Sequence, residues 1–292
     1  QALENDWTLV ISVAGSASSS GTTVSGNIQV SYAQNDTTAT IGNNTKATAY
    51  DSIGIVADQQ SNIYLVAANA SLSGGSTSIG GTTITAVLLN HTEASAGNNV
   101  DLTAYALNQA ADAGIRTPNR AERRKGIVVS ATSDQQILML GIAASGTGGN
   151  TAVAGVVDTL VILNKTNAHI GNNARVTSGT TASTDRNGDG SGDGDSSEGH
   201  IWITAEDLST VFNFGGALSA SSSTGVGATV ITLVFDKDVT ASLGAVYDSN
   251  GTLIANTSGS AIATGDVTVS AISGDDRSEE HTSELQSPCN LV

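Results

Sequence analysis

The sequence predicts an all-β fold in which related segments stack as the layers of a solenoid. Three observations support this prediction. One sequence frame occurs four times, its apolar runs are short and bounded by glycine and asparagine, and the composition is rich in small and β-branched residues. One such unit cannot close a core alone, so stacked copies are expected to bury a continuous one.

The frame occupies residues 26–42, 81–97, 155–171 and 228–244. Each copy begins with an apolar run, which is short and β-branched and therefore favours a strand over a helix. A polar residue then interrupts each copy at the same place, and an alanine precedes the closing glycine by three residues. The interrupting polar residues are Asn35, Asn90, Asn164 and Lys237. The alanines are Ala39, Ala94, Ala168 and Ala241, and the closing glycines are Gly42, Gly97, Gly171 and Gly244.

The frame divides residues 1–276 into a single solenoid of about four repeats, which are 5–60, 61–136, 137–209 and 210–276. Each repeat opens with a strand, passes a Ser/Gly-rich corner, and continues through the frame to its closing glycine, which begins a Gly-Asn-Asn turn at Gly42, Gly97 and Gly171. Gly and Asn suit this turn because both adopt left-handed backbone angles at low cost. The acidic residues Asp58, Asp134, Glu206 and Asp207 are expected mainly in loops and turns. The insertions are expected to lie after the frame, at one consistent place in each repeat.

Composition narrows the class of partner. The chain has 11 basic and 27 acidic residues, a net charge of −16, which disfavours nucleic acid and anionic membranes. No apolar run reaches the ~18 residues that a membrane helix requires, so this segment is not expected to insert into a membrane. The only cysteine is Cys289. It lies in residues 277–292, where RSEEHTSELQSP resembles a translated sequencing adapter, so these residues are expected to be a non-native tail.

The segments NKTNAHIGNNARV (164–176), GHIWITAED (199–207) and GDVTVSA (265–271) carry a resemblance to a known family. They resemble the passenger repeats of large bacterial filamentous adhesins, of the leukotoxin and filamentous-haemagglutinin-like types exported by type V secretion. The resemblance covers residues 5 to about 275. It implies a right-handed parallel β-helix that is part of a longer chain, secreted or displayed on the bacterial cell surface, and used for attachment to a receptor or glycan.

Residues 185–198, DRNGDGSGDGDSSE, form the sharpest candidate site. A calcium loop places oxygen ligands at alternate positions and a glycine at the sixth, and the first six residues meet this pattern. Ser196 stands at the twelfth position, where such loops have a glutamate. The alternative is a solvated acidic insertion. The candidate calcium ligands are Asp185, Asn187, Asp189, Ser191, Asp193, Asp195 and Glu198.

Other residues have two interpretations. The basic run 116–125 would dock a sulfated glycan or an acidic partner, although a solvated loop is favoured. Trp7 and Trp202 are interpreted as packing at corners of the coil, with a carbohydrate platform as the alternative. Val211, Phe212 and Phe214 are interpreted as core residues.

The expected function is therefore a rigid, non-catalytic stalk of an adhesin that binds through its insertions. One alternative is a polysaccharide-degrading β-helical enzyme, which a groove of convergent carboxylates would favour. Another is an ice-binding solenoid, suggested by Thr22-Thr23, Thr37-Thr38 and Thr82-Thr83. A flat rank of threonines would favour it, whereas a smooth polar surface with protruding loops would favour the adhesin.

Overall fold

The computed structural model describes the backbone of residues 1–107, 115–117, 120–247, 253–256 and 260–284. Within these ranges the fold is all-β and contains no helix. No helix there is therefore long and apolar enough to span a bilayer. Residues 285–292 of the expected non-native tail lie outside the described residues, and the backbone of 277–284 continues the last strand.

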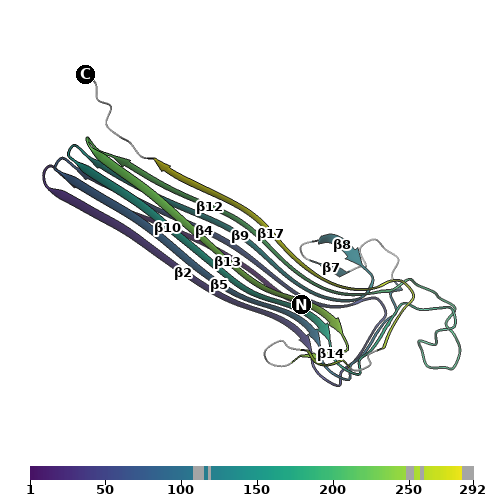
Figure 1. The fold of residues 1–292 in the computed structure, drawn as a ribbon. Helices are drawn as coiled ribbons and strands as arrows, with labels where there is room; N and C mark the ends of the chain where they lie inside the picture. The colour runs from purple at the N-terminus through teal and green to yellow at the C-terminus, as the bar shows by residue number, and fades with distance from the viewer. Residues whose placement is uncertain (108–114, 118–119, 248–252, 257–259, 285–292) are drawn as a thin grey trace.

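The long strands form two extended parallel sheets (Figure 1). Sheet A has the order β1-β4-β9-β12-β17, and sheet B has the order β13-β10-β5-β2. The strands of sheet A are β1 (Ala2–Ser18), β4 (Ile53–Ser73), β9 (Gly126–Thr147), β12 (His200–Ala220) and β17 (Val267–Glu284). Those of sheet B are β2 (Thr22–Ile41), β5 (Thr77–Ala96), β10 (Thr151–Ile170) and β13 (Thr224–Leu243).

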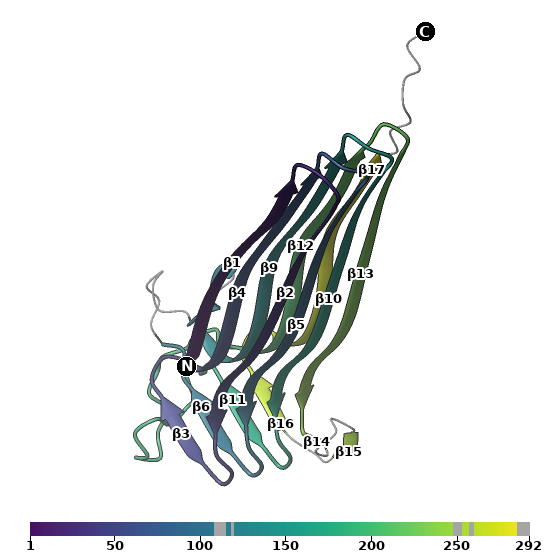
Figure 2. The same ribbon diagram turned by 90° about the vertical axis from the view of Figure 1, so that its left-hand side faces the viewer.

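A third parallel sheet, sheet C, has the order β16-β11-β6-β3 and lies at one end of the long strands (Figure 2). Its strands are β3 (Lys46–Ala49), β6 (Asp101–Ala104), β11 (Arg175–Ser178) and β16 (Ser260–Ala263). Two short antiparallel pairs lie in the insertions: β7 (Ile115–Thr117) with β8 (Arg120–Arg124), and β14 (Ala245–Tyr247) with β15 (Leu253–Asn256). The chain therefore runs repeatedly from sheet A to sheet B to sheet C and back.

The pairing register confirms the frame that the sequence predicts. Asn90 pairs with Asn35 on one side and Asn164 on the other, and Asn164 pairs with Lys237. The aligned alanines pair in the same order. The second asparagine of each Gly-Asn-Asn turn has a φ of 53° to 57°, so the expected left-handed turn is confirmed at Asn44, Asn99 and Asn173.

Two expectations about placement are wrong. Asp58, Asp134, Glu206 and Asp207 lie inside strands β4, β9 and β12, so the expected boundaries after residues 60, 136 and 209 fall within strands of sheet A. The strands are longer than the apolar runs, because polar residues continue the alternation on both sides. The insertions also leave from two corners: 107–125 and 179–199 follow sheet C, whereas 244–259 precedes it.

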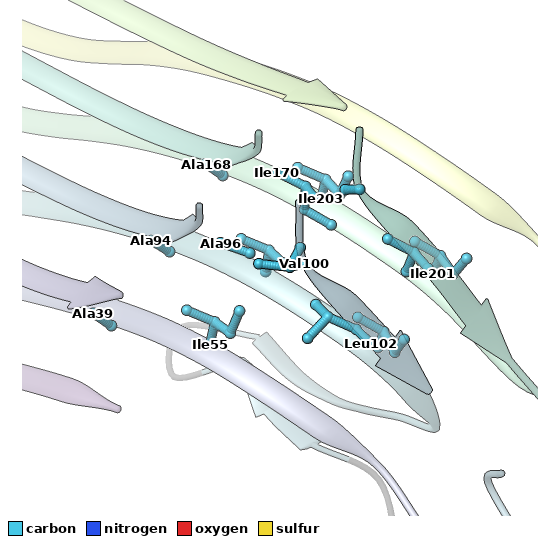
Figure 3. Close-up of a cluster of buried hydrophobic side chains, with 14 of the residues drawn as sticks. Ala39, Ile55, Ala94, Ala96, Val100, Leu102, Ala168, Ile170, Ile201 and Ile203 are labelled. Atoms are coloured by element: carbon cyan, nitrogen blue, oxygen red, sulfur yellow. The ribbon is translucent and has the colours of Figure 1, made fainter. Parts of the chain in front are cut away.

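Inward-facing side chains form the core between the sheets. The largest apolar cluster lies where sheets A, B and C meet, and includes Ala94, Leu102, Ile170 and Ile203 (Figure 3). A second cluster around Leu65, Leu88 and Leu160 lies further along the long strands. A buried polar layer separates the two clusters.

The polar layer is a continuous hydrogen-bonded network. Asn35 donates from its Nδ2 to Oδ1 of Asn90 at 3.2 Å, and Asn90 donates to Oδ1 of Asn164 at 3.2 Å. Sheet A faces this row with Gln59, which accepts from Ser133, and with Gln135, which accepts from Asn164 at 2.8 Å. Each amide thereby forms a hydrogen bond with a buried polar neighbour. Such a group destabilises the fold by about 1–3 kcal/mol when it is left without a partner.

Lys237 replaces asparagine in the fourth layer and brings a buried charge. Its Nζ lies 2.8 Å from Oδ1 of Asp207 and 2.5 Å from Oδ1 of Asp275. Asp207 is fully buried, and it also accepts hydrogen bonds from Asn164 and Thr166. The lysine side chain is only 5% exposed, so water stabilises its charge little. The charges of Lys237 and Asp207 therefore stabilise each other.

We predict that Lys237→Asn destabilises the protein by about 3–5 kcal/mol, because Asp207 is then a buried charge without its cation. Adding Asp207→Ser should recover most of this loss. The double variant has asparagine at 237 and serine at 207, the same uncharged pair that the preceding layer has at Asn164 and Ser133. Denaturant titration of both variants measures the difference. Equal stability of the single and double variants would contradict this account of the layer.

Candidate functional site

The acidic loop 179–199 leaves sheet C and returns to β12 through a network of its own. Asp185 accepts backbone N–H groups from Gly188 and Gly190, both at 2.7 Å. The hydrogen bond from Gly190, followed by that from Gly188, holds the pKa of the Asp185 carboxyl below its usual value. Asn187 and Asp189 accept N–H groups two residues further on, from Asp189 at 2.9 Å and Ser191 at 2.8 Å.

Arg186 occupies the position between these residues and the later acids. Its backbone N–H donates to Oδ2 of Asp193 at 2.6 Å, and its Nη2 donates to Oδ2 of Asp195 at 2.8 Å. The arginine side chain is only 11% exposed, so this contact is part of the folded loop. It places a cation against two of the predicted calcium ligands, an effect that the oxygen-ligand pattern alone does not reveal.

The structure therefore brings together some of the predicted ligands. Asp185, Asn187, Asp189 and Asp193 share the hydrogen bonds of one loop, and Ser191 joins it through its N–H group. The exposed Glu198 instead flanks Ser197, which bonds to the Tyr105 carbonyl beside sheet C. No group of three or more carboxylate, histidine or cysteine side chains in the described part of the chain has a geometry able to hold a metal.

A small cavity lies on the outer face of sheet A, beside the insertion that carries β7 and β8. Its volume is about 100 Å³, and its wall includes Arg124, Trp202, Glu206 and the hydroxyl groups of Thr132 and Ser270. The Arg124 guanidinium lies 3.3 Å from the centre of the Trp202 ring, a cation–π contact. One face of Trp202 is thus already covered by a residue of the predicted basic run.

Of that basic run, only Arg124 and Lys125 have described side chains; the side chains of Arg116, Arg120 and Arg123 lie outside the described residues. The expected placement of the tryptophans at corners is wrong, because Trp7 and Trp202 lie within β1 and β12. Trp7 points outward and is 63% exposed. Both belong to long strands whose outward positions the sequence frame does not mark.

Glu206 lines the cavity, and Asp58 and Asp134 lie on the neighbouring strands β4 and β9 of sheet A, on the same outward face. Burial raises the pKa of Asp58 to about 6, with a further contribution from the charge of Asp134. Burial also raises the pKa of Asp134, helped by Glu206 and Asp207. Sequence reasoning placed these acids in separate turns, whereas parallel pairing brings them to one face. Clusters of acids with raised pKa values are typical of sites that transfer protons.

Asp158 is a second buried acid, on the inward face of β10. Neither carboxylate oxygen has a hydrogen-bond partner, and burial raises its pKa to about 7. Sheet A accommodates it with Gly141 and Gly215. A Cβ at Gly141 would lie 2.7 Å from Oδ1 of Asp158, so only glycine leaves room there.

We predict that Asp158 makes the protein less stable as pH rises. Its pKa is about 7 in the folded chain against 3.8 as the ordinary value, so the folded state holds a proton that the unfolded state releases between these values. The contribution of Asp158 to stability should be greatest below pH 3.8 and fall until about pH 7, by ~4 kcal/mol at most at about 1.4 kcal/mol per pKa unit.

The isosteric variant Asp158→Asn provides the control. Denaturant titrations from pH 4 to pH 8 are compared, and the difference between the natural chain and the variant should grow with pH in this window. Asp58 and Asp134 remain in both proteins, so their contribution of the same sign cancels. A constant difference across the window would show that Asp158 does not titrate as described.

Comparisons of this chain with protein-family models, with curated proteins and with solved structures gave no match.

Proposed function

We propose that the chain is a segment of a right-handed parallel β-helix that serves as the rigid, non-catalytic stalk of an exported bacterial surface adhesin. Its insertions would bind a receptor or glycan on a host or neighbouring cell. One observation carries this proposal: the insertions gather at the sheet C end of the long strands, whereas the opposite end has only short Ser/Gly-rich turns (Figures 1 and 2).

The passage of the chain through sheets A, B and C, with like positions paired in register, supports the β-helical part of the proposal. The buried network adds support for a stiff stalk, because hydrogen bonds join each layer to the next. A stalk built of repeated layers holds terminal loops at fixed positions relative to one another.

The chemistry of the cavity supports a glycan as ligand. Trp202, Glu206 and the hydroxyl groups of Thr132 and Ser270 offer an apolar ring edge, an acceptor and several donors in one wall. Sugars expose hydroxyl groups next to apolar C–H faces, and small-molecule sites combine apolar lining with a few placed polar groups. A volume of about 100 Å³ is suited to one side group of a larger glycan rather than a whole ring system.

Calcium remains part of this proposal through the loop 179–199. Asp185, Asn187 and Asp189 already form the tight turn that such loops use. Coordination by Asp193 or Asp195 requires that Arg186 first release them. We therefore propose that calcium binding, where it occurs, rearranges the side chain of Arg186.

A polysaccharide-degrading enzyme is the second candidate, and the acids Asp58, Asp134 and Glu206 on one face of sheet A favour it. Glycoside hydrolysis uses one carboxyl with a raised pKa and a second carboxylate. An ice-binding solenoid is the third candidate. Thr22, Thr77, Thr151 and Thr224 pair in one outward row of sheet B, although the next outward row consists of Val24, Ile79, Val153 and Val226.

The test uses residues 1–276 on beads, presented to bacterial and host cells and to arrays of neutral and sulfated glycans, with and without calcium. We predict that Trp202→Ala, or replacement of residues 182–195 by a Gly-Ser linker, reduces binding at least tenfold. Ser20→Ala in the turn at the opposite end serves as the control and should bind like the natural chain.

Other outcomes separate the candidates. Release of reducing ends from a polysaccharide, lost in Asp134→Asn, would replace the adhesin proposal by the enzyme. Thermal hysteresis in the same preparation would favour the ice-binding candidate. Calorimetry with calcium, performed on the natural chain and on the chain with the linker, tests the metal separately. Absence of binding to every cell and glycan would overturn the adhesin proposal.

A further inference from the structure

The buried cluster around Lys237 contains the three chemical groups that an amide transfer requires. Lys237 supplies a primary amine, Asn164 a carboxamide, and Asp207 a carboxyl group that contacts both. All three side chains are almost completely shielded from water. Asparagine completes the polar layer at the other copies of the frame, so the layer itself does not require a lysine. A lysine amine that loses its proton is a nucleophile, and asparagine cannot supply this chemistry.

The strand register places the amine and the carboxamide on adjacent layers. Lys237 of β13 pairs with Asn164 of β10, and neighbouring strands lie ~4.8 Å apart. Nζ of Lys237 lies 2.8 Å from Oδ1 of Asp207, and Nδ2 of Asn164 lies 3.3 Å from the same oxygen. The two nitrogens are therefore neighbours around one carboxylate oxygen. The lysine chain has four flexible carbons, so it can carry Nζ to the Asn164 carbonyl carbon without movement of either strand.

The hydrogen bonds of Asn164 prepare its carboxamide for attack by an amine. Its Oδ1 accepts a hydrogen bond from Nδ2 of Asn90 at 3.2 Å. A donor thus faces the oxygen on which negative charge develops when a nucleophile adds to the carbon. Nδ2 of Asn164 donates to Oδ2 of Asp207 at 3.1 Å and to Gln135 at 2.8 Å. Asp207 therefore contacts the attacking nitrogen and also the nitrogen that has to leave.

We propose that Lys237 and Asn164 form an intramolecular isopeptide bond. Asp207 takes a proton from the Lys237 ammonium, and the lone pair of the freed amine forms a bond from Nζ to Cγ of Asn164. The bond from Cγ to Nδ2 then breaks, and Nδ2 takes one proton and leaves as ammonia. The lysine nitrogen loses two protons in all, and the second stays on Asp207. Atoms and charges balance without an oxidant or another reactant.

Burial favours this product over the starting ion pair. Charges are unfavourable in a protein interior, and the reaction replaces the ammonium and the carboxylate by a neutral amide and a neutral acid. The ammonia escapes to solvent, so the reverse reaction lacks its reactant. The ion pair between Lys237 and Asp207 described above is the state before this reaction. The new bond joins the third and fourth copies of the frame covalently, which adds to the proposed stalk a staple between layers.

Asp275 is the competing electrophile, because its Oδ1 lies 2.5 Å from Nζ of Lys237. Reaction at Asp275 would release water instead of ammonia. An ionised carboxylate repels the lone pair of an amine, whereas a carboxamide is neutral and needs no prior protonation. Asp275 is also 26% exposed, so its carboxylate stays in contact with water. Together with the Gly274 carbonyl, which accepts from Nζ at 3.2 Å, Asp275 instead holds the lysine in place.

Mass spectrometry of the intact 292-residue chain tests the proposal. We predict that the natural chain, after folding and incubation at neutral pH, is lighter than its sequence by one ammonia molecule. Lys237→Arg should keep the full mass, because arginine retains the cation beside Asp207 but stays protonated and cannot attack. Asp207→Asn should slow the mass loss at least tenfold, since it removes the proton acceptor. Circular dichroism establishes that both variants fold.

The natural chain held unfolded in denaturant provides a control without any substitution. It should keep its full mass until it is refolded, because only the folded layers bring Lys237 to Asn164. Tryptic digestion then locates the bond. Trypsin no longer cleaves after a lysine whose amine is acylated, so the peptides that contain Asn164 and Lys237 should appear as one branched species that is absent from Lys237→Arg.

A natural chain that keeps its full mass after long incubation in the folded state would overturn the proposal. Cyclisation of Gln1, or of the Asn187-Gly188 pair, also releases ammonia. A mass loss that persists in Lys237→Arg without a branched peptide would therefore assign the ammonia to such a side reaction and contradict the bond. Loss of water, with a branched peptide that joins Lys237 to Asp275, would overturn the assignment of Asn164 as the electrophile.

Discussion

The structure depends on in-register parallel pairing that places like residues on top of one another. The inward asparagines show why register matters, because each amide can donate to the next layer only if that layer places an acceptor at the same height, an amide oxygen for Asn35 and Asn90 and the Asp207 carboxylate for Asn164. A shift of one residue would turn every inward side chain outward and leave these amides unpaired. The network thus selects a single alignment among many that the small, similar residues of this chain would otherwise permit.

This constraint also explains where the chain departs from its own pattern. Lys237 takes the asparagine position only where Asp207 and Asp275 supply charge beside it. Asp158 takes an apolar position only where two glycines in the facing sheet leave space. The insertions, in contrast, leave at the ends of strands, where they do not interrupt the pairing of the long sheets. Variation therefore concentrates at the end that we propose to bind a partner.

The aligned frame could be predicted from sequence because Asn, Ala and Gly recur at fixed spacing, and these are the residues that the network, the tight core and the turn require. The face that the long strands bury could not be predicted in the same way. Alternation shows that Phe212 and Phe214 share a side of β12, and hydrophobicity assigns that side to the core. The facing sheet decides otherwise, because the inward positions of this part of β12 are taken by Val211, Asn213 and Gly215, and a Cβ at Gly215 would lie 2.4 Å from the Thr229 side chain of sheet B. Nor does spacing reveal that Arg186 folds back on Asp193 and Asp195.

Disulfide formation between neighbouring layers tests the register most directly. In a Cys289→Ser background, Thr85→Cys with Thr159→Cys places two outward cysteines on paired residues of β5 and β10. Paired positions of adjacent strands lie about 5 Å apart at Cα, within the range a disulfide requires. The account predicts rapid oxidation of this pair and little of Thr85→Cys with Val161→Cys, which is offset by two residues. Preferential cross-linking of the offset pair, or of neither pair, would contradict the stacking on which the structure and its proposed functions depend.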